Sequence, residues 1–83
     1  MLVTLKLYAS LGVYLPDGAL KNEAKVDVAG GTTIRQLLDD HNVPPVSCHL
    51  VLLNGHFQAP AIRAGVQLKE GDAVAVWPPV AGG

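Results

Sequence analysis

The sequence predicts an α+β fold in which one short helix covers one face of a mixed sheet of four to five strands. Three observations carry this prediction: several segments alternate with period two, one segment has a helical apolar stripe, and the predicted elements follow the order β-β-α-β-β-β. The chain has 83 residues, of which 49% are hydrophobic and 16% charged. This size and composition indicate one small ordered domain rather than a disordered segment.

Two strands are predicted before the helix. Leu2 to Ala9 alternates, with Val3, Leu5, Leu7 and Ala9 on the side expected to be buried. A loop rich in glycine and proline follows. Lys25 to Val28 alternates again and gives a second strand that ends at Gly30-Gly31.

The helix is predicted from its cap and its stripe. Thr33 and Gln36 have the spacing of a capping box, in which each side chain accepts from the other residue's amide. Apolar positions and His41 then recur at i, i+3, i+4 and i+7 from Ile34 to His41. Asn42 suits a left-handed C-terminal residue, and Pro44-Pro45 cannot continue the helix.

The second half of the chain supplies the remaining strands. His49 to Leu53 is an apolar run that ends in Asn54-Gly55, a pair typical of a type I′ hairpin turn. His56 to Ala59 is the expected return strand, and Pro60 to Gly71 is expected to be a loop. Asp72 to Trp77 alternates and forms the last strand.

A distinctive tail follows this last strand. Pro78-Pro79 has no amide donors, so it ends the hydrogen-bond ladder and keeps the chain extended. We therefore expect a domain at residues 1–77 and a flexible tail, Pro-Pro-Val-Ala-Gly-Gly, at 78–83, able to reach roughly 20 Å. Gly82 and Gly83 lack side chains and can enter a narrow tunnel. The reactive group of the tail is the α-carboxylate of Gly83; the alternative is a terminus that is merely frayed.

The segment from Glu70 to Gly83, which contains a turn, a strand, an aromatic residue and Pro-Pro-Val-Ala-Gly-Gly, resembles the C-terminus of the small subunit of molybdopterin synthase, of the MoaD/ThiS type. Thr33 to Leu38 resembles the start of that family's helix, and Leu53 to Gly55 its central hairpin. Trp77 stands where Phe or Tyr is more usual, and Gln36 where Glu is usual. The resemblance implies a ubiquitin-like β-grasp fold whose last strand lies parallel to the first in the middle of the sheet.

The resemblance also implies a sulfur carrier that is not catalytic alone. An E1-like partner would adenylate the Gly83 carboxylate with ATP, and a sulfur donor would convert the adenylate to a thiocarboxylate. The large synthase subunit, in a heterotetramer, would then use this sulfur to build the pterin dithiolene that binds molybdenum or tungsten. No cofactor is expected on this chain itself.

Alternation places Trp77 on the strand face opposite Val74 and Val76. We expect Trp77 to be exposed there as an interface anchor, sharing a shallow apolar patch with Ala73, Ala75 and Leu52. The alternative is that the loop at residues 60–71 folds over it. The expected partner-binding residues are Trp77, Pro78, Pro79, Val80, Ala81, Gly82, Ala75 and Leu52.

Other features exclude function classes or remain minor candidates. A net charge of −1 gives no basic footprint for nucleic acid, and no apolar run is long enough to span a membrane. The N-terminus does not resemble a signal peptide, and the single cysteine cannot form an internal disulfide, so we expect a cytoplasmic location.

Cys48 is expected to be a buried hydrophobe, with a persulfide carrier as the alternative. No metal site is expected from the three histidines, and Lys6, Arg35 and Arg63 are candidate contacts at the rim of the interface.

Three rival functions stay open. One is a carrier of the same fold for tungsten pterin, thiamine thiazole or cysteine synthesis, although Pro78-Pro79 argues against the thiamine type. Another is a protein modifier that joins Gly83 to lysine by an isopeptide bond. The last is an interaction module with a passive tail.

Overall fold

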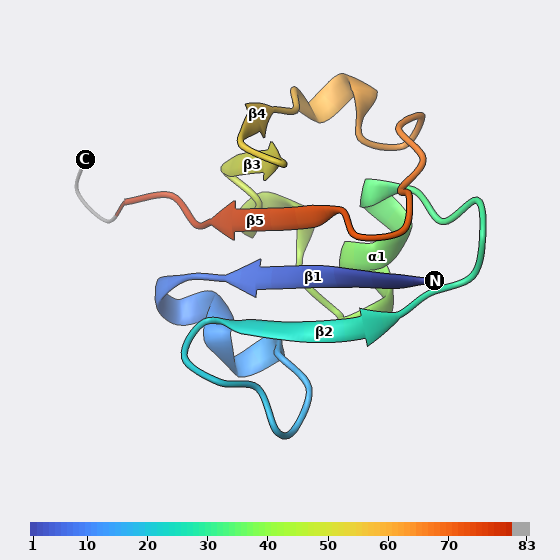
Figure 1. Ribbon diagram of the computed structural model, residues 1–83. Helices are drawn as coiled ribbons and strands as arrows, with labels where there is room; N and C mark the ends of the chain where they lie inside the picture. The colour runs from blue at the N-terminus through green and yellow to red at the C-terminus, as the bar shows by residue number, and fades with distance from the viewer. Residues whose placement is uncertain (81–83) are drawn as a thin grey trace.

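A computed structural model describes residues 1–80 as a five-stranded mixed sheet with one main helix (Figure 1). The strands are β1 (Leu2–Leu7), β2 (Glu23–Asp27), β3 (Leu50–Leu53), β4 (His56–Phe57) and β5 (Ala73–Trp77). They lie in the order β2-β1-β5-β3-β4, and β5 runs parallel to β1 and antiparallel to β3. This is the ubiquitin-like β-grasp fold, with the predicted parallel central pair. The tail therefore begins at the middle of the sheet.

Alternation along the strands divides the sheet into two faces. Val3, Leu5 and Leu7 of β1 are fully buried, and so are Val74 and Val76 of β5. These side chains form the core together with the apolar side of the helix, Ile34, Leu37 and Leu38. Because apolar side chains face this core, they recur every two residues along the strands and every three to four residues along the helix. These are the two patterns that predicted the elements from the sequence. Ala9 is the exception: β1 ends at Leu7, and Ala9 is exposed with φ 53°.

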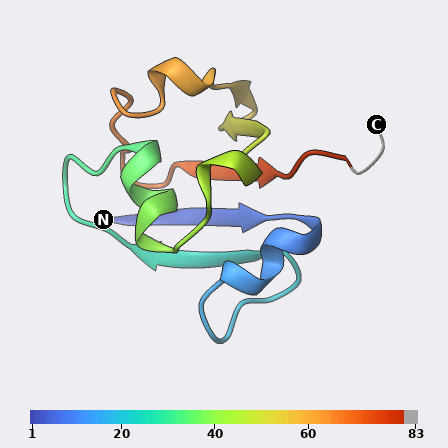
Figure 2. The same ribbon diagram turned by 180° about the vertical axis from the view of Figure 1, so that it is seen from behind.

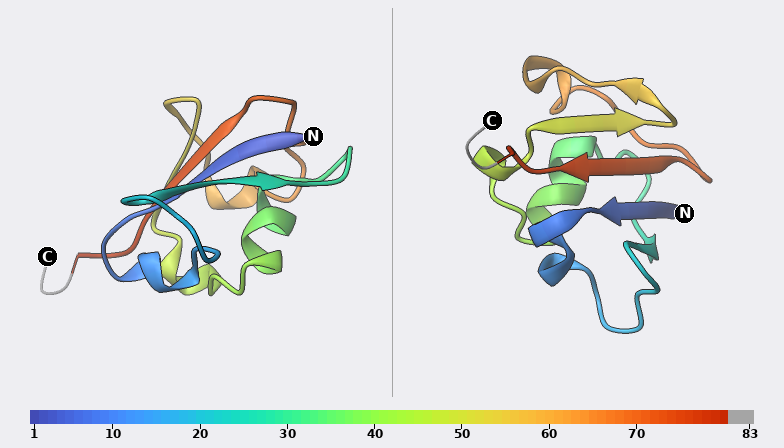
Figure 3. Two further views of the ribbon diagram at one scale, coloured as in Figure 1. Left: turned by 60° about the horizontal axis from the view of Figure 1, so that its bottom comes forward. Right: turned by 90° about the vertical axis from the view of Figure 1, so that its left-hand side faces the viewer.

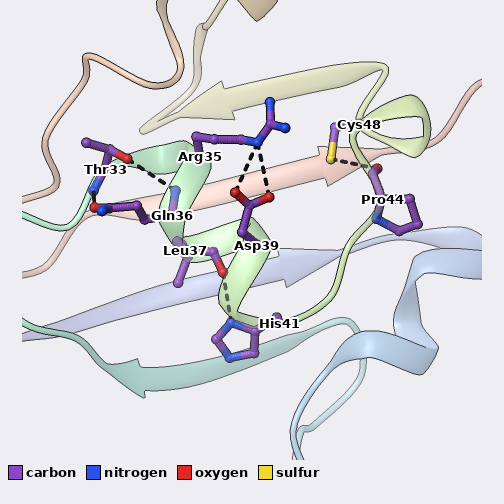
Figure 4. A network of polar contacts seen from close by, with 8 residues as sticks. All are labelled: Thr33, Arg35, Gln36, Leu37, Asp39, His41, Pro44 and Cys48. Atoms are coloured by element: carbon purple, nitrogen blue, oxygen red, sulfur yellow. Dashed lines mark hydrogen bonds and ion pairs between the residues drawn. The ribbon is translucent and has the colours of Figure 1, made fainter.

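Helix α1 (Ile34–Asp40) begins with the predicted capping box. The Gln36 amide donates to Thr33 Oγ1 (3.1 Å), and the Thr33 amide donates to Gln36 Oε1 (3.0 Å). The helix ends one residue earlier than predicted, because His41 is the C-cap and its Nδ1 donates back to the Leu37 carbonyl (3.0 Å, Figure 4). Asn42 has φ 63°, the left-handed conformation expected at this position.

The capping box gives a testable stability difference. Replacing Thr33 with Ala removes the acceptor for the Gln36 amide, so we expect the free energy of unfolding to fall by about 1 kcal/mol. Urea unfolding followed by the fluorescence of the single tryptophan measures this change. Thr33→Ser keeps the hydroxyl and is the matched control; a Thr33→Ala variant as stable as Thr33→Ser would show that the box contributes nothing.

The hairpin between β3 and β4 has the predicted turn, because Asn54 and Gly55 both have positive φ (50° and 85°). The Asn54 side chain also ties this turn to the start of β5. Its Nδ2 donates to Asp72 Oδ1 (2.9 Å), and its Oδ1 accepts from the Ala73 amide (2.9 Å). These two hydrogen bonds of the Asn54 side chain fix the point at which β5 enters the sheet.

Three short 3-10 helices were not predicted: η1 (Ala9–Tyr14), η2 (Pro45–Ser47) and η3 (Pro60–Ile62). Two of them begin with proline, which favours the first position of a helical turn. All the helical segments lie on one side of the sheet (Figures 2 and 3). The other side, which we call the open face, looks toward the viewer in Figure 1 and has no helix over it among residues 1–80.

Candidate functional site

The root of the tail lies at the end of the central strand β5. The Tyr8 amide donates to the Val76 carbonyl, and the His49 amide donates to the Trp77 carbonyl (both 3.1 Å). The strand ends at Trp77, directly before Pro78-Pro79, as predicted. Residues 78–80 continue past the end of the sheet (Figure 1), where Pro79 is exposed and Val80 is 78% exposed. Ala81, Gly82 and Gly83, three of the predicted site residues, lie outside the described residues.

Trp77 lies on the open face, as alternation predicted, but it is half-buried rather than fully exposed. Its ring is stacked on that of Tyr8, with the ring centroids 4.4 Å apart and the planes within 3° of parallel. Each ring covers one side of the other, which explains the lower exposure. The parallel pairing of β1 and β5 produces this contact, since it brings the residue after β1 next to the end of β5.

The open face carries a continuous apolar surface beside this stack. Leu50 pairs with Trp77, and Leu52 pairs with the predicted Ala75 and, on its other side, with Phe57. Leu52 and Ala75 are half-buried, whereas Phe57 is 58% exposed. We call this surface the apolar patch; it comprises Tyr8, Leu50, Leu52, Phe57, Ala75 and Trp77.

Sequence reasoning missed Tyr8, Leu50 and Phe57. Leu50 and Leu52 alternate, which was a usable signal for their common face. Tyr8 and Phe57 could not be assigned, because their positions depend on the pairing of strands that are far apart in the sequence. The loop at residues 60–71 does not cover the patch. It packs on the helix side, where the Ile34 amide donates to the Val66 carbonyl (3.0 Å) and Leu68 is buried.

The three candidate rim cations lie in different places. Lys6 is on the open face, opposite Ala75, and can contact a molecule that covers the patch. Arg35 lies on α1, on the helix side of the sheet, where its Nε donates to Asp39 (3.0 Å, Figure 4). Arg63 is only 5% exposed and donates to backbone carbonyls, so the expectation of a rim contact is wrong for it.

Cys48 is buried, 7% exposed, as predicted. Its Sγ donates to the Pro44 carbonyl (3.5 Å, Figure 4). Burial raises the pKa of the Cys48 thiol, although nearby Arg63 opposes this effect. The thiol form is therefore dominant at neutral pH, and thiols are poor nucleophiles.

Among residues 1–80, no group of three or more His, Cys, Asp and Glu side chains is arranged to hold a metal ion. Within the same residues, no helix has the length and hydropathy needed to cross a bilayer.

Solved structures with the same fold cover 96% or 100% of this chain. SAMP1 from Haloferax volcanii, a small archaeal modifier protein, is 28% identical with a TM-score of 0.67, and 100% of each chain is covered. The thiamine biosynthesis protein ThiS from Geobacter metallireducens is 24% identical over 96% of this chain and 99% of that chain, with a TM-score of 0.61. A complex of subunits 1 and 2 of the molybdopterin-converting factor from Helicobacter pylori contains a chain that is 19% identical, with 100% of each chain covered and a TM-score of 0.58. No curated protein matches this chain.

The family assignment comes from the sequence itself. The model of the ThiS family matches residues 17–83, which include the helix, the hairpin, β5 and the tail. The chain thus combines a β-grasp fold, a tail that leaves the centre of the sheet and a sequence match over most of its length. It belongs to the ThiS family and is a ubiquitin-like sulfur carrier of the MoaD/ThiS type.

Proposed function

We propose that this carrier is the small, sulfur-donating subunit of a molybdopterin synthase. The group that receives the sulfur is the α-carboxylate of Gly83. The observation that carries the proposal is the central strand β5, which ends at Trp77-Pro78-Pro79 beside the apolar patch. A tail that starts at this point can enter a partner's active site while the patch docks on the same partner. The Pro-Pro-Val spacer resembles that of molybdopterin synthase small subunits more closely than that of the thiamine type.

The chemistry requires two partners and no catalytic side chain on this chain. The Gly83 carboxylate attacks the α-phosphorus of ATP on an E1-like enzyme, and pyrophosphate leaves. Sulfide displaces AMP from the acyl adenylate and leaves a C-terminal thiocarboxylate directly. A persulfide donor instead displaces AMP to form an acyl disulfide, and a thiol of the donor protein then attacks the donor's sulfur in this bond, which releases the thiocarboxylate and leaves a disulfide on the donor. In the synthase, the sulfur is transferred to the pterin precursor, and water restores the carboxylate. We place these steps in the cytoplasm, where the single Cys48 stays reduced.

The apolar patch is the proposed docking surface for both partners. Half-buried leucine and aromatic side chains with little charge are typical of interface centres. Lys6 lies at the edge of the patch and can pair with an acidic group of the partner. The Helicobacter pylori relative was solved in complex with subunit 2, which supports a large subunit as one of the two partners. Since both partners need the same surface, their binding should be mutually exclusive.

A protein modifier is the second candidate. The identity of 28% to SAMP1 favours it over the remaining rivals. In that function the Gly83 carboxyl group forms an isopeptide bond with a lysine of a target protein. The same tail and the same adenylation step serve both functions, so only the acceptor distinguishes them.

One experiment separates these functions. Chemically prepared thiocarboxylate of the full chain is mixed with a molybdopterin synthase large subunit and the cyclic pterin precursor, and the dithiolene product is measured. We expect product in proportion to the thiocarboxylate supplied, and none when the unloaded chain is used. No product, together with lysines in cell extracts that carry the tryptic remnant of residues 70–83 joined through Gly83, would assign the chain to the modifiers instead.

The buried thiol gives a prediction about the route of sulfur. Cys48→Ser keeps a donor for the Pro44 carbonyl and removes the sulfur, so the yield of thiocarboxylate should stay within about twofold of wild type. The yield is measured by intact mass after loading. A loss of loading in a variant that is still folded would favour the route through a persulfide on Cys48.

A further inference from the structure

A small cavity lies on the helix side of the sheet, opposite the apolar patch. It has a volume of about 70 Å³. This is several times the roughly 10–15 Å³ that one water molecule needs. Helix α1, the segment that follows it and the η3 region supply the lining, which includes Arg35, Asp39, Cys48 and Arg63.

Arg63 is the unusual member of this lining. Its Nε donates to the Gln58 carbonyl (2.9 Å), and its Nη1 donates to the Cys48 carbonyl (2.8 Å). These two bonds hold the guanidinium plane in place. Its Nη2 is buried and has no hydrogen-bond partner among the described residues.

Arg63 also lacks an acidic partner within the part of the chain that the structure describes. The ion pairs found within residues 1–80 join Met1 to Asp27 and Arg35 to Asp39, and neither includes Arg63. Buried charges in proteins are normally paired, because burial removes the water that solvates them. Burial accordingly lowers the pKa of Arg63. The Arg63 guanidinium is therefore a buried cation, 5% exposed, that no carboxylate of residues 1–80 neutralises.

The remaining charges around the cavity favour an anion. Arg35 and Arg63 bring two positive charges, and Asp39 brings one negative charge. The thiol of Cys48 is neutral, since burial raises its pKa. The lining of the cavity therefore carries a net positive charge, although the whole chain has a net charge of −1. Any attraction of an anion comes from these local charges and not from the charge of the whole chain. Arg35 and Asp39 lie together on the exposed side of α1 (Figure 4).

We propose that this cavity binds a small oxyanion, a carboxylate or phosphate group, with Arg63 as the main donor and Arg35 as the second cation. A planar guanidinium with an unused N–H group matches an oxyanion better than it matches any neutral ligand. None of the residues that line the cavity belongs to the apolar patch or to residues 78–80. It is therefore independent of which sulfur pathway the carrier serves.

The full chain is titrated with sodium phosphate, and separately with sodium acetate, at constant ionic strength. The NMR signals of the Arg35 and Arg63 Nε–H groups and of the Cys48 amide report on the cavity. We expect saturable shifts at these three residues in the millimolar range with at least one of the anions. Saturation by phosphate alone would assign a phosphoryl ligand, and saturation by acetate alone would assign a carboxylate, such as an acidic side chain of a partner.

Variants on the exposed side of α1 test the assignment without disturbing the buried Arg63. Arg35→Gln should weaken binding by on the order of tenfold, the value of one charge-assisted hydrogen bond. Asp39→Asn should tighten binding, because it removes the negative charge and releases Arg35. Lys69→Gln removes a positive charge outside the cavity and should leave affinity within about twofold.

Two results would overturn the proposal. One is the absence of a saturable shift with either anion, which would mean that the cavity holds only water. The other is an equal loss of affinity in Arg35→Gln and Lys69→Gln, which would mean nonspecific attraction. Neither result bears on sulfur loading at Gly83, so this proposal and the proposed function can fail separately.

Discussion

Adding one alanine after Gly83 should abolish sulfur loading while leaving the fold unchanged. The extra residue moves the terminal carboxylate by about 3.4 Å and places a methyl group where the diglycine end enters the partner. A displacement of only about 1 Å can lower an enzymatic rate by on the order of 10²-fold, so the loss should be at least this large. Loading is measured by intact mass after reaction with the adenylating enzyme, ATP and a sulfur source. Circular dichroism and urea unfolding should match those of wild type, because the sheet ends at Trp77.

A matched control leaves the whole tail unchanged. Leu20→Ala shortens a side chain that is 77% exposed in the segment before β2 and keeps both the tail length and the two glycines. This variant should load at close to the wild-type rate. Full loading of the extended chain would show that the terminal carboxylate of Gly83 is not the loaded group, and would leave the tail as a passive segment.

Replacing Trp77 with Ala should weaken partner binding by on the order of 2 kcal/mol, or about 30-fold in Kd. The substitution removes the largest side chain of the apolar patch and leaves Tyr8 without the ring on which it is stacked. Trp77 is half-buried on the open face and is not part of the buried core, so the variant should still fold. Titration calorimetry with the adenylating enzyme and with the large synthase subunit measures both affinities.

Two further variants identify the cause of that loss. Trp77→Phe keeps an aromatic ring against Tyr8 and should recover most of the affinity. Val13→Ala removes an exposed apolar side chain of η1, outside the patch, and should leave Kd unchanged. An affinity of Trp77→Ala equal to that of wild type for both partners would remove the patch from the interface.

The predictions that succeeded rest on residues close together in the sequence. The capping box of Thr33 and Gln36 and the turn at Asn54-Gly55 are each specified within four residues. The alternation of β5 also follows from its own residues, because one of its faces is buried. The parallel placement of β5 beside β1 came instead from a resemblance to a known family.

What could not be predicted depends on long-range pairing. The apolar patch joins Tyr8 of the segment after β1 with residues of β3, β4 and β5, and no local pattern specifies that register. Arg63 was expected at the surface because charged residues are mostly exposed. Arg63 can be buried because the backbone carbonyls of Cys48 and Gln58 accept hydrogen bonds from its guanidinium. These carbonyls are brought to Arg63 by the fold and are not evident from the sequence. The short 3-10 helices have too few residues to produce a periodic pattern.

The most direct test is the intact mass of the full chain after incubation with an adenylating partner, ATP and a sulfur donor. The predicted result is a single mass shift equal to the replacement of one oxygen by sulfur, located at Gly83 by fragmentation and absent when ATP is omitted. An unchanged mass with a partner that loads its own carrier, or a shift located at Cys48 instead of Gly83, would contradict the proposal that the C-terminal carboxylate carries the sulfur.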